Sequence, residues 1–273
     1  MNKKEKREYH SRSNGVFFEI TRTLFEKKSR FQEIEIIENP YFGRMLFLDG
    51  LVQTTERDEF FYHEMLVHPA MLTHSDPRKI LIIGGGDGGA LIQTLRYPIA
   101  KVRMVEIDAD VIAAAKKYFP WLRPCLEDKR AEIVIADGRT FLEDSQDKYD
   151  VIFIDSSEPV GPSVTLHERK FFEIVKDKLT LSGVACAQMG APFFQTQPLM
   201  QAKADLKDIF RFVRFYLAPV PTYPGGNWCY VYLSDETDPF AIKRDPPADL
   251  KYYNPDIHRA AFALPNYLRE ILM

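Results

Sequence analysis

The sequence is poor in cysteine and has no excess of basic residues. Its 273 residues include three cysteines, Cys125, Cys186 and Cys229, which show neither metal-ligand spacing nor the pattern of a disulfide framework. Such scattered thiols are typical of the reducing cytoplasm. The formal net charge is -3, whereas domains that bind nucleic acids are usually basic. We therefore expect a cytoplasmic protein without a nucleic-acid partner and without a metal site.

Long apolar segments are also missing. Residues 1–9 are largely charged and lack the apolar stretch of a secretory signal. No later run is long and apolar enough to span a membrane, and we find no internal repeat or low-complexity segment. Hydrophobic residues nevertheless make up 45% of the chain, which is enough for a sizeable core. These features favour a globular protein that has no membrane partner.

A glycine cluster directly after an apolar run is the most informative stretch that is present. Residues 79–83 are typical of a buried strand, and Gly84, Gly86 and Gly89 follow in the spacing G-x-G-x-x-G. Glycine permits positive φ angles and lets a ligand approach the backbone closely. The lysine of a phosphate-binding P-loop is missing after these glycines. The pattern therefore predicts a nucleotide-binding strand, loop and helix, and it disfavours a nucleoside triphosphatase.

The order of the remaining patterns predicts an α/β fold. Apolar strands are expected at residues 79–83, 102–107, 133–136, 151–154 and 184–187, with helical patterns between them. This alternation is typical of a parallel sheet covered by helices on both faces. Residues 15–54 instead alternate apolar and polar side chains and contain Asp49-Gly50, a strong hairpin signal. We predict a small antiparallel β-domain over residues 1–54 and an α/β domain over residues 55–273.

Polar residues stand at the carboxyl ends of the predicted strands, the edge where open α/β sheets bind ligands. Glu106 lies about twenty residues beyond the glycine loop, where an acid can accept hydrogen bonds from both ribose hydroxyls. Asp137 can accept a hydrogen bond from an adenine amino group. Asp87, inside the glycine loop, would oppose a pyrophosphate and favour a cationic group. We therefore expect an adenosine-containing ligand that carries a positive charge.

Two carboxylates, Asp155 and Glu158, lie three residues apart in the turn after residue 154. One of them can hold a cation while the other accepts a proton. Residues 160–163, which continue this loop, have the mixed rigid and flexible composition of a lid. A plain turn with helix caps is the alternative interpretation of these residues.

Several motifs together resemble those of the spermidine synthases, the polyamine aminopropyltransferases. They occur, in the family's order and spacing, at residues 48–50, 56–60, 79–89, 105–108, 137–138, 155–162, 221–225 and 252–265. The resemblance extends from about residue 17 to the end of the sequence. It implies a Rossmann-like sheet of the class I methyltransferase type, a small N-terminal antiparallel β-domain, and a homodimer or homotetramer.

The resemblance also implies a reaction and a set of site residues. An aminopropyl group would pass from decarboxylated S-adenosylmethionine, a co-substrate and not a tightly bound cofactor, to the diamine putrescine. The products would be spermidine and methylthioadenosine, with Asp155 as the general base. The residues that would hold the donor are Gln32, Gly84, Gly86, Asp87, Glu106, Asp137, Gly138 and Pro162. Those that would bind the amine are Tyr62, His63, Glu158, Gln188 and Tyr223.

Some of these interpretations stay open. Glu158 stands where the family most often has aspartate, and residues 189–191 lack an acid that some members carry after the matching glutamine. Agmatine and cadaverine are therefore alternative acceptors. An S-adenosylmethionine-dependent amine N-methyltransferase and an inactive homologue that only binds a partner are further alternatives, although the intact Asp155, Tyr62 and Gln188 argue against the inactive one. Without the resemblance, the tyrosines and His63 would be interpreted as structural residues.

Overall fold

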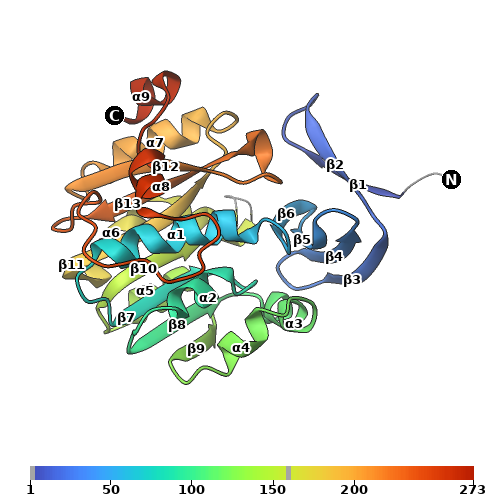
Figure 1. The fold of residues 1–273 in the computed structure, drawn as a ribbon, viewed down its shortest axis with the longest axis horizontal. Helices are drawn as coiled ribbons and strands as arrows, with labels where there is room; N and C mark the ends of the chain where they lie inside the picture. Colours follow the sequence, from blue (N-terminus) through green and yellow to red (C-terminus); the bar gives the residue numbers. More distant parts are fainter. Residues whose placement is uncertain (1–3, 158–160) are drawn as a thin grey trace.

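A large mixed sheet covered by helices makes up most of the molecule, and a smaller all-β part lies beside it (Figure 1). The computed structural model describes residues 4–157 and 161–273. This arrangement confirms the predicted α/β fold with an antiparallel N-terminal region. In the described part of the chain, no helix combines the length and the apolar character needed to cross a bilayer.

The N-terminal part contains a two-stranded and a four-stranded antiparallel sheet. The first pairs β1 (Glu5–Tyr9) with β2 (Gly15–Glu19), and the second has the order β3 (Arg22–Lys28), β4 (Glu33–Asn39), β5 (Gly43–Leu48) and β6 (Leu51–Thr55). Asp49 and Gly50 form the turn between β5 and β6 with φ angles of 48° and 80°. Two positive φ angles are what a two-residue hairpin turn of type I′ needs, so the predicted hairpin forms at this Asp-Gly pair.

The large sheet has the strand order β12-β13-β11-β10-β7-β8-β9 within the described residues. Its strands are β7 (Lys79–Gly84), β8 (Lys101–Glu106), β9 (Ala131–Ile135), β10 (Tyr149–Asp155), β11 (Leu179–Gly190), β12 (Phe212–Pro219) and β13 (Asn227–Ser234). Strands β7 to β11 pair in parallel, whereas β13 is antiparallel to both β11 and β12. The sheet is thus mostly parallel and has an antiparallel edge.

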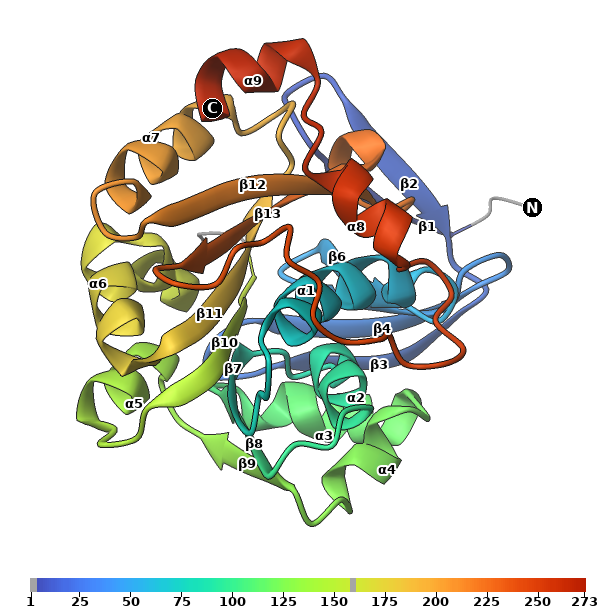
Figure 2. The ribbon, with the colours of Figure 1, turned by 60° about the vertical axis from the view of Figure 1, so that its left-hand side comes forward.

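Helices cover both faces of this sheet (Figures 1 and 2). Side chains of α1 (Glu59–Thr73), α2 (Gly89–Leu95), α3 (Ala109–Tyr118), α4 (Leu122–Leu126) and α8 (Pro255–Ala261) belong to one core. Those of α5 (Gly138–Asp144), α6 (Arg169–Lys178), α7 (Thr196–Leu206) and α9 (Asn266–Leu272) belong to the other. The described residues also form two short 3-10 helices, η1 (Gly161–His167) and η2 (Pro224–Gly226).

The two cores explain why the central strand is apolar throughout. Successive side chains of a strand point to opposite faces of the sheet. Ile80 and Ile82 accordingly pack in the core under α1 and α2, while Leu81 and Ile83 pack in the core under α5 and α6. All four are at most 1% exposed. A strand covered on both sides therefore shows no alternation of polar and apolar residues, and its carboxyl end is the first place where it meets a cavity.

Candidate active site

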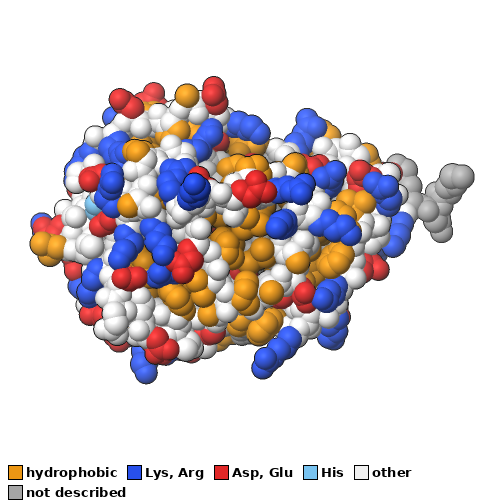
Figure 3. All heavy atoms as spheres, turned by 90° about the horizontal axis from the view of Figure 1, so that it is seen from below, with side chains coloured by type: hydrophobic (Ala, Val, Ile, Leu, Met, Phe, Trp, Pro, Cys, Tyr) orange, Lys and Arg blue, Asp and Glu red, His pale blue; other side chains and the backbone are white. Residues whose placement is uncertain are grey.

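A cavity of about 170 Å³ lies at the carboxyl edge of the large sheet, where this edge faces the N-terminal β-sheets. Its walls come from the ends of β7, β8 and β10, from the start of α1 and from β1 and the β5–β6 hairpin. Figure 3 shows apolar side chains gathered where the small part of the molecule meets the large part. Apolar and aromatic walls with convergent polar side chains are typical of a small-molecule site, and several of the polar side chains in this cavity are acids.

Gly84 shapes the floor of this cavity. It ends β7 with a φ angle of +82°, and a Cβ atom at this position would lie 2.3 Å from the carbonyl oxygen of Asp155. Only glycine lets the ends of β7 and β10 run so close together. The same turn leads into Asp87 and α2, so the carboxylates of Asp87 and Asp155 are brought to one side of the cavity. Gly86 and Gly138, also predicted for the site, line the cavity as well.

Glu106 and Asp137 line the part of the cavity beyond the glycine loop. Glu106 is 8% exposed, and burial raises its pKa to about 7 although the Asp108 N–H donates to its carboxylate over 2.9 Å. Asp137 caps the N-terminus of α5 and accepts a hydrogen bond from the Thr140 N–H at 2.8 Å. Its predicted ligand role therefore coincides with a structural one. Gln32, in the connection between β3 and β4, donates to Asp108 over 3.1 Å and reaches the same region.

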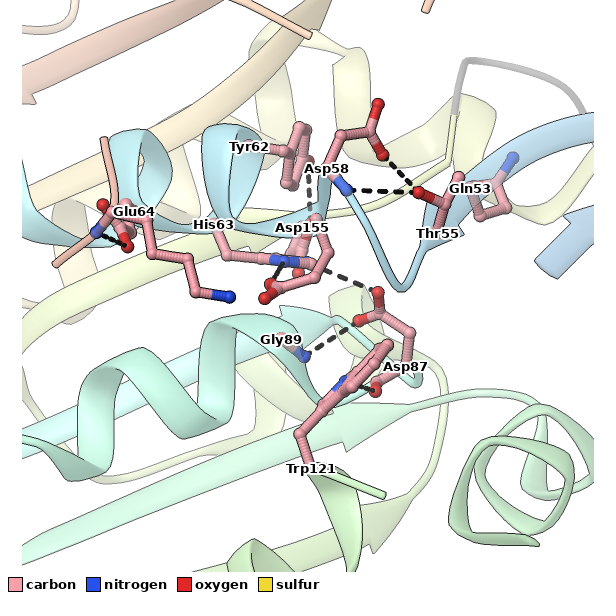
Figure 4. Close-up of polar contacts among 12 residues, drawn as sticks. Gln53, Thr55, Asp58, Tyr62, His63, Glu64, Asp87, Gly89, Trp121 and Asp155 are labelled. Atoms are coloured by element: carbon pink, nitrogen blue, oxygen red, sulfur yellow. Dashed lines mark hydrogen bonds and ion pairs between the residues drawn. The ribbon is translucent and has the colours of Figure 1, made fainter. Parts of the chain in front are cut away.

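Asp155 occupies the centre of the site (Figure 4). The Tyr62 hydroxyl donates to its Oδ1 over 2.7 Å, whereas its buried Oδ2 has no hydrogen-bond partner among the described residues. Burial raises the pKa of Asp155 to about 6, His63 opposes this rise and Asp87 adds to it. A buried carboxylate oxygen without a partner is costly unless a ligand completes it. This atom is therefore the point at which we expect a proton or an ammonium group.

His63 lies between carboxylates. Its Nδ1 is 2.8 Å from Glu59 Oε2, and its Nε2 is 3.4 Å from Asp87 Oδ2. Burial disfavours the charged imidazole, but Asp87 and Glu59 outweigh burial and hold the pKa of His63 well above its usual value. Burial favours a raised pKa for Asp87, but His63 outweighs burial and lowers this pKa, helped by the Gly89 N–H, which donates to Asp87 over 3.1 Å.

The central cluster keeps a net negative charge. Ligand atoms of His63, Asp87 and Asp155 lie within 4.8 Å of one another, a spacing that a metal ion could also use. One imidazolium faces these two acids and Glu59, so a cationic ligand is favoured here. Glu59 belongs to the motif at residues 56–60, but sequence analysis gave it no role in the site. Its position four residues before His63 on the same helix, where side chains meet, is the signal that could have suggested one.

Two tyrosines and Gln188 form the opposite wall. The rings of Tyr62 and Tyr223 lie 5.7 Å apart, and the Tyr223 hydroxyl donates to the Gln53 carbonyl oxygen. Gln188 donates to the Ser156 carbonyl over 3.0 Å and accepts from the Gly190 N–H. The structure thus brings the predicted amine-binding residues Tyr62, His63, Gln188 and Tyr223 together. Glu158 lies outside the described residues, as does the side chain of Pro162.

Glu8, to which sequence analysis gave no role, is a further acid of this cavity. It comes from β1, is 4% exposed and accepts a hydrogen bond from the Val52 N–H over 2.8 Å. His10, two residues later, approaches Glu8 with its Nε2 at 3.4 Å. No sequence signal marks Glu8, because residues 5–9 have no apolar periodicity and the path of the β1–β2 hairpin over the cavity depends on distant contacts.

The fold and the site define a Rossmann-like enzyme with a cavity of small-molecule size that is lined by several acidic side chains. Residues 59–244 match the model of the spermine/spermidine synthase domain, and residues 6–56 match that of the spermidine synthase tetramerisation domain. The chain therefore belongs to the spermine/spermidine synthase family, and it is an aminopropyltransferase. This confirms the resemblance found in the motifs.

Individual relatives cover nearly the whole chain. The polyamine aminopropyltransferase of Shouchella clausii is 43% identical over 94% of this chain and 95% of its own length. That of Bacillus subtilis is 38% identical over 97% of both chains. A crystal structure of spermidine synthase in complex with the transition-state analogue AdoDATO has a TM-score of 0.96 and 38% identity, covering 100% of this chain and 96% of the other. The spermidine synthase of Thermotoga maritima has a TM-score of 0.94 and 37% identity, with 100% and 95% covered.

Proposed function

We propose that this chain transfers an aminopropyl group from decarboxylated S-adenosylmethionine to putrescine, giving spermidine and methylthioadenosine, with Asp155 as the general base. The observation that carries the proposal is the state of Asp155. One of its oxygens is held by Tyr62 and the other is buried without a partner among the described residues. It also lines the same cavity as Asp87, Tyr62 and Tyr223.

The donor would lie along the glycine loop. Glu106 would accept hydrogen bonds from the ribose hydroxyls and Asp137 from the adenine amino group. Asp87 would face the ammonium of the transferred aminopropyl chain. The further donor-binding residues would be Gln32, Gly84, Gly86, Gly138 and Pro162. The spermidine synthase structure of the same fold that contains the transition-state analogue AdoDATO supports a transfer reaction in this cavity.

The acceptor determines what the protein must do. An alkylamine has a pKa near that of lysine, about 10, so it arrives protonated and without a nucleophilic lone pair. Asp155 Oδ2 would take this proton. The freed lone pair then attacks the donor carbon bonded to the sulfonium. A C–N bond forms, the C–S bond breaks, and its electron pair passes to sulfur, which leaves as the neutral thioether of methylthioadenosine.

The described residues suit these roles. The Tyr62 O–H holds Oδ1 of the carboxylate, which would leave Oδ2 for the reacting amine. A base with a pKa of about 6 is ionised at neutral pH, as a general base must be. The Tyr62 and Tyr223 rings would enclose the methylene chain of putrescine, and Gln188 and Glu158 would complete the amine site. Glu8 lines the same cavity and would attract the distal ammonium in place of the acid that is missing after Gln188.

The amine itself is tested by steady-state kinetics with putrescine, cadaverine and agmatine at a fixed, saturating donor concentration. We expect putrescine to give the highest kcat/KM. A higher value for agmatine or cadaverine would refute the amine assignment and leave aminopropyl transfer intact. Methylated amines formed from S-adenosylmethionine would instead indicate the N-methyltransferase alternative.

We also propose that residues 1–54 and 55–273 are separate domains and that the chain forms a homodimer or homotetramer in the cytoplasm. The tetramerisation model that matches residues 6–56 supports assembly, and the three cysteines are buried and free, as a reducing compartment allows. Light scattering coupled to size-exclusion chromatography measures the assembly. A monomer at micromolar concentration would refute this part of the proposal.

A further inference from the structure

Asp58 links the start of α1 to the segment that precedes η2. Its side chain is buried, and its Oδ2 accepts hydrogen bonds from the Thr222 hydroxyl at 2.8 Å and the Thr222 N–H at 3.1 Å. Its Oδ1 accepts a hydrogen bond from the Thr55 hydroxyl at 2.6 Å. Figure 4 shows Asp58 and Thr55 directly before the turn of α1 that carries Tyr62. One carboxylate therefore joins β6, α1 and residue 222.

The residue after Thr222 is Tyr223, which is held from the same side. Its hydroxyl donates to the Gln53 carbonyl oxygen on β6, so the junction of β6 and α1 holds both the backbone before Tyr223 and the end of its ring. Tyr223 packs against Trp228 at 4.6 Å and faces Tyr62 at 5.7 Å. These three aromatic side chains all line the cavity.

We infer that Asp58 is a positioning residue, which fixes the separation of the Tyr62 and Tyr223 walls and thereby the affinity for the amine. This inference depends on the proposed function, in which the two rings enclose the acceptor. An asparagine at position 58 cannot accept all three hydrogen bonds, because its amide nitrogen is a donor. One buried donor of Thr55 or Thr222 is then left unpaired, which favours a shift of the segment.

The test compares Asp58→Asn and Thr222→Val with a matched pair at the other end of the sheet. There, Asp150 Oδ2 accepts hydrogen bonds from the Arg78 and Lys79 N–H groups, both at 2.9 Å, and its Oδ1 accepts from the Thr180 hydroxyl at 3.2 Å. Asp150→Asn and Thr180→Val thus remove the same kinds of bond away from the cavity. Thr222→Ser keeps the hydroxyl and serves as the rescue variant.

The measurements are the KM and kcat for whichever amine the wild type uses best, the Kd for methylthioadenosine by calorimetry, and Tm. Asp58→Asn and Thr222→Val should raise the amine KM about 10-fold or more and change the Kd less than about 3-fold. Thr222→Ser should stay near wild type. In a Tyr223→Phe background, Asp58→Asn should raise the amine KM little further, because the effects of residues that act through one another are not additive. The control variants Asp150→Asn and Thr180→Val should lower Tm but leave the amine KM and the Kd for methylthioadenosine unchanged.

Three results would overturn the inference: an unchanged amine KM in Asp58→Asn, an equal loss of methylthioadenosine affinity, or the same kinetic change in Asp150→Asn. If Asp58→Asn does not fold, Thr222→Val decides by the same criteria. A wild-type enzyme that transfers an aminopropyl group to no amine would refute the proposed function, and this inference with it, whereas a different preferred amine would affect neither the design nor the expected result.

Discussion

Replacing Asp155 by asparagine should lower the catalytic rate and raise the stability of the folded protein. The substitution keeps the shape and the Tyr62 hydrogen bond, because an amide oxygen can also accept from a hydroxyl. It removes the only group proposed to take the amine proton. Since general-base catalysis contributes roughly 10²–10⁴-fold, kcat should fall by that factor while calorimetry shows nearly unchanged binding of methylthioadenosine.

The stability of the same variant should rise at neutral pH. The pKa of Asp155 is raised from 3.8 to about 6 by burial, so the folded protein binds a proton more readily than the unfolded chain does. The free energy of unfolding therefore falls as the pH rises from about 4 to about 6, because the buried carboxylate loses its proton. Above about pH 6 this destabilisation stays constant. A shift of this size corresponds to roughly 3 kcal/mol at most. Asp155→Asn should increase Tm at pH 8 by several degrees, and the gain should vanish near pH 4.

Both effects are measured on one preparation, by methylthioadenosine release and by thermal unfolding across pH 4–8. In the wild type, kcat should fall as the pH drops below about 6, because the base becomes protonated. The variant should lose this acid limb. Turnover near the wild-type rate at neutral pH, or an unchanged acid limb in Asp155→Asn, would remove Asp155 from the role of base.

Three further predictions concern the neighbouring groups. S-adenosylmethionine should bind at least about 100-fold more weakly than its decarboxylated form, because its carboxylate would meet Asp87; equal affinities by calorimetry would contradict this. Glu106→Gln should weaken donor binding but raise Tm at pH 8, with no gain at pH 4, because burial raises the pKa of Glu106 to about 7; a loss of Tm at pH 8 would refute it. Tyr62→Phe should move the acid limb of kcat to higher pH, because its hydroxyl lowers the pKa of Asp155; an unmoved limb would exclude that coupling.

Sequence patterns were sufficient to predict the site residues that lie at the ends of strands. Parallel strands finish at a common edge, so Glu106, Asp137, Asp155 and Gln188 could be expected to meet once the apolar runs were recognised, and the cavity contains all four. Their roles toward substrates stay predictions. The glycine loop was equally accessible, because the close approach of β7 and β10 at Gly84 requires the absence of a side chain.

Contacts between distant segments could not be derived in this way. The approach of Glu8 to the cavity depends on how the β1–β2 hairpin packs, and the Asp58–Thr222 bonds join residues 164 positions apart. Neither has a periodicity or a spacing that a sequence pattern could reveal. The charge on His63 likewise depends on Asp87, which lies on another element. The antiparallel pairing of β13 with β11 and β12 could not be derived either, because the direction of pairing follows from the connection and not from composition.

Mass spectrometry of the reaction products tests the central claim most directly. The purified protein is incubated with decarboxylated S-adenosylmethionine and putrescine, and in parallel with S-adenosylmethionine and putrescine, with Asp155→Asn as the matched control. We predict spermidine and methylthioadenosine in equal amounts from the decarboxylated donor, little product from S-adenosylmethionine, and a loss of roughly 10²–10⁴-fold in the variant. N-methylputrescine from S-adenosylmethionine, or no aminopropylated amine from the decarboxylated donor, would contradict the account.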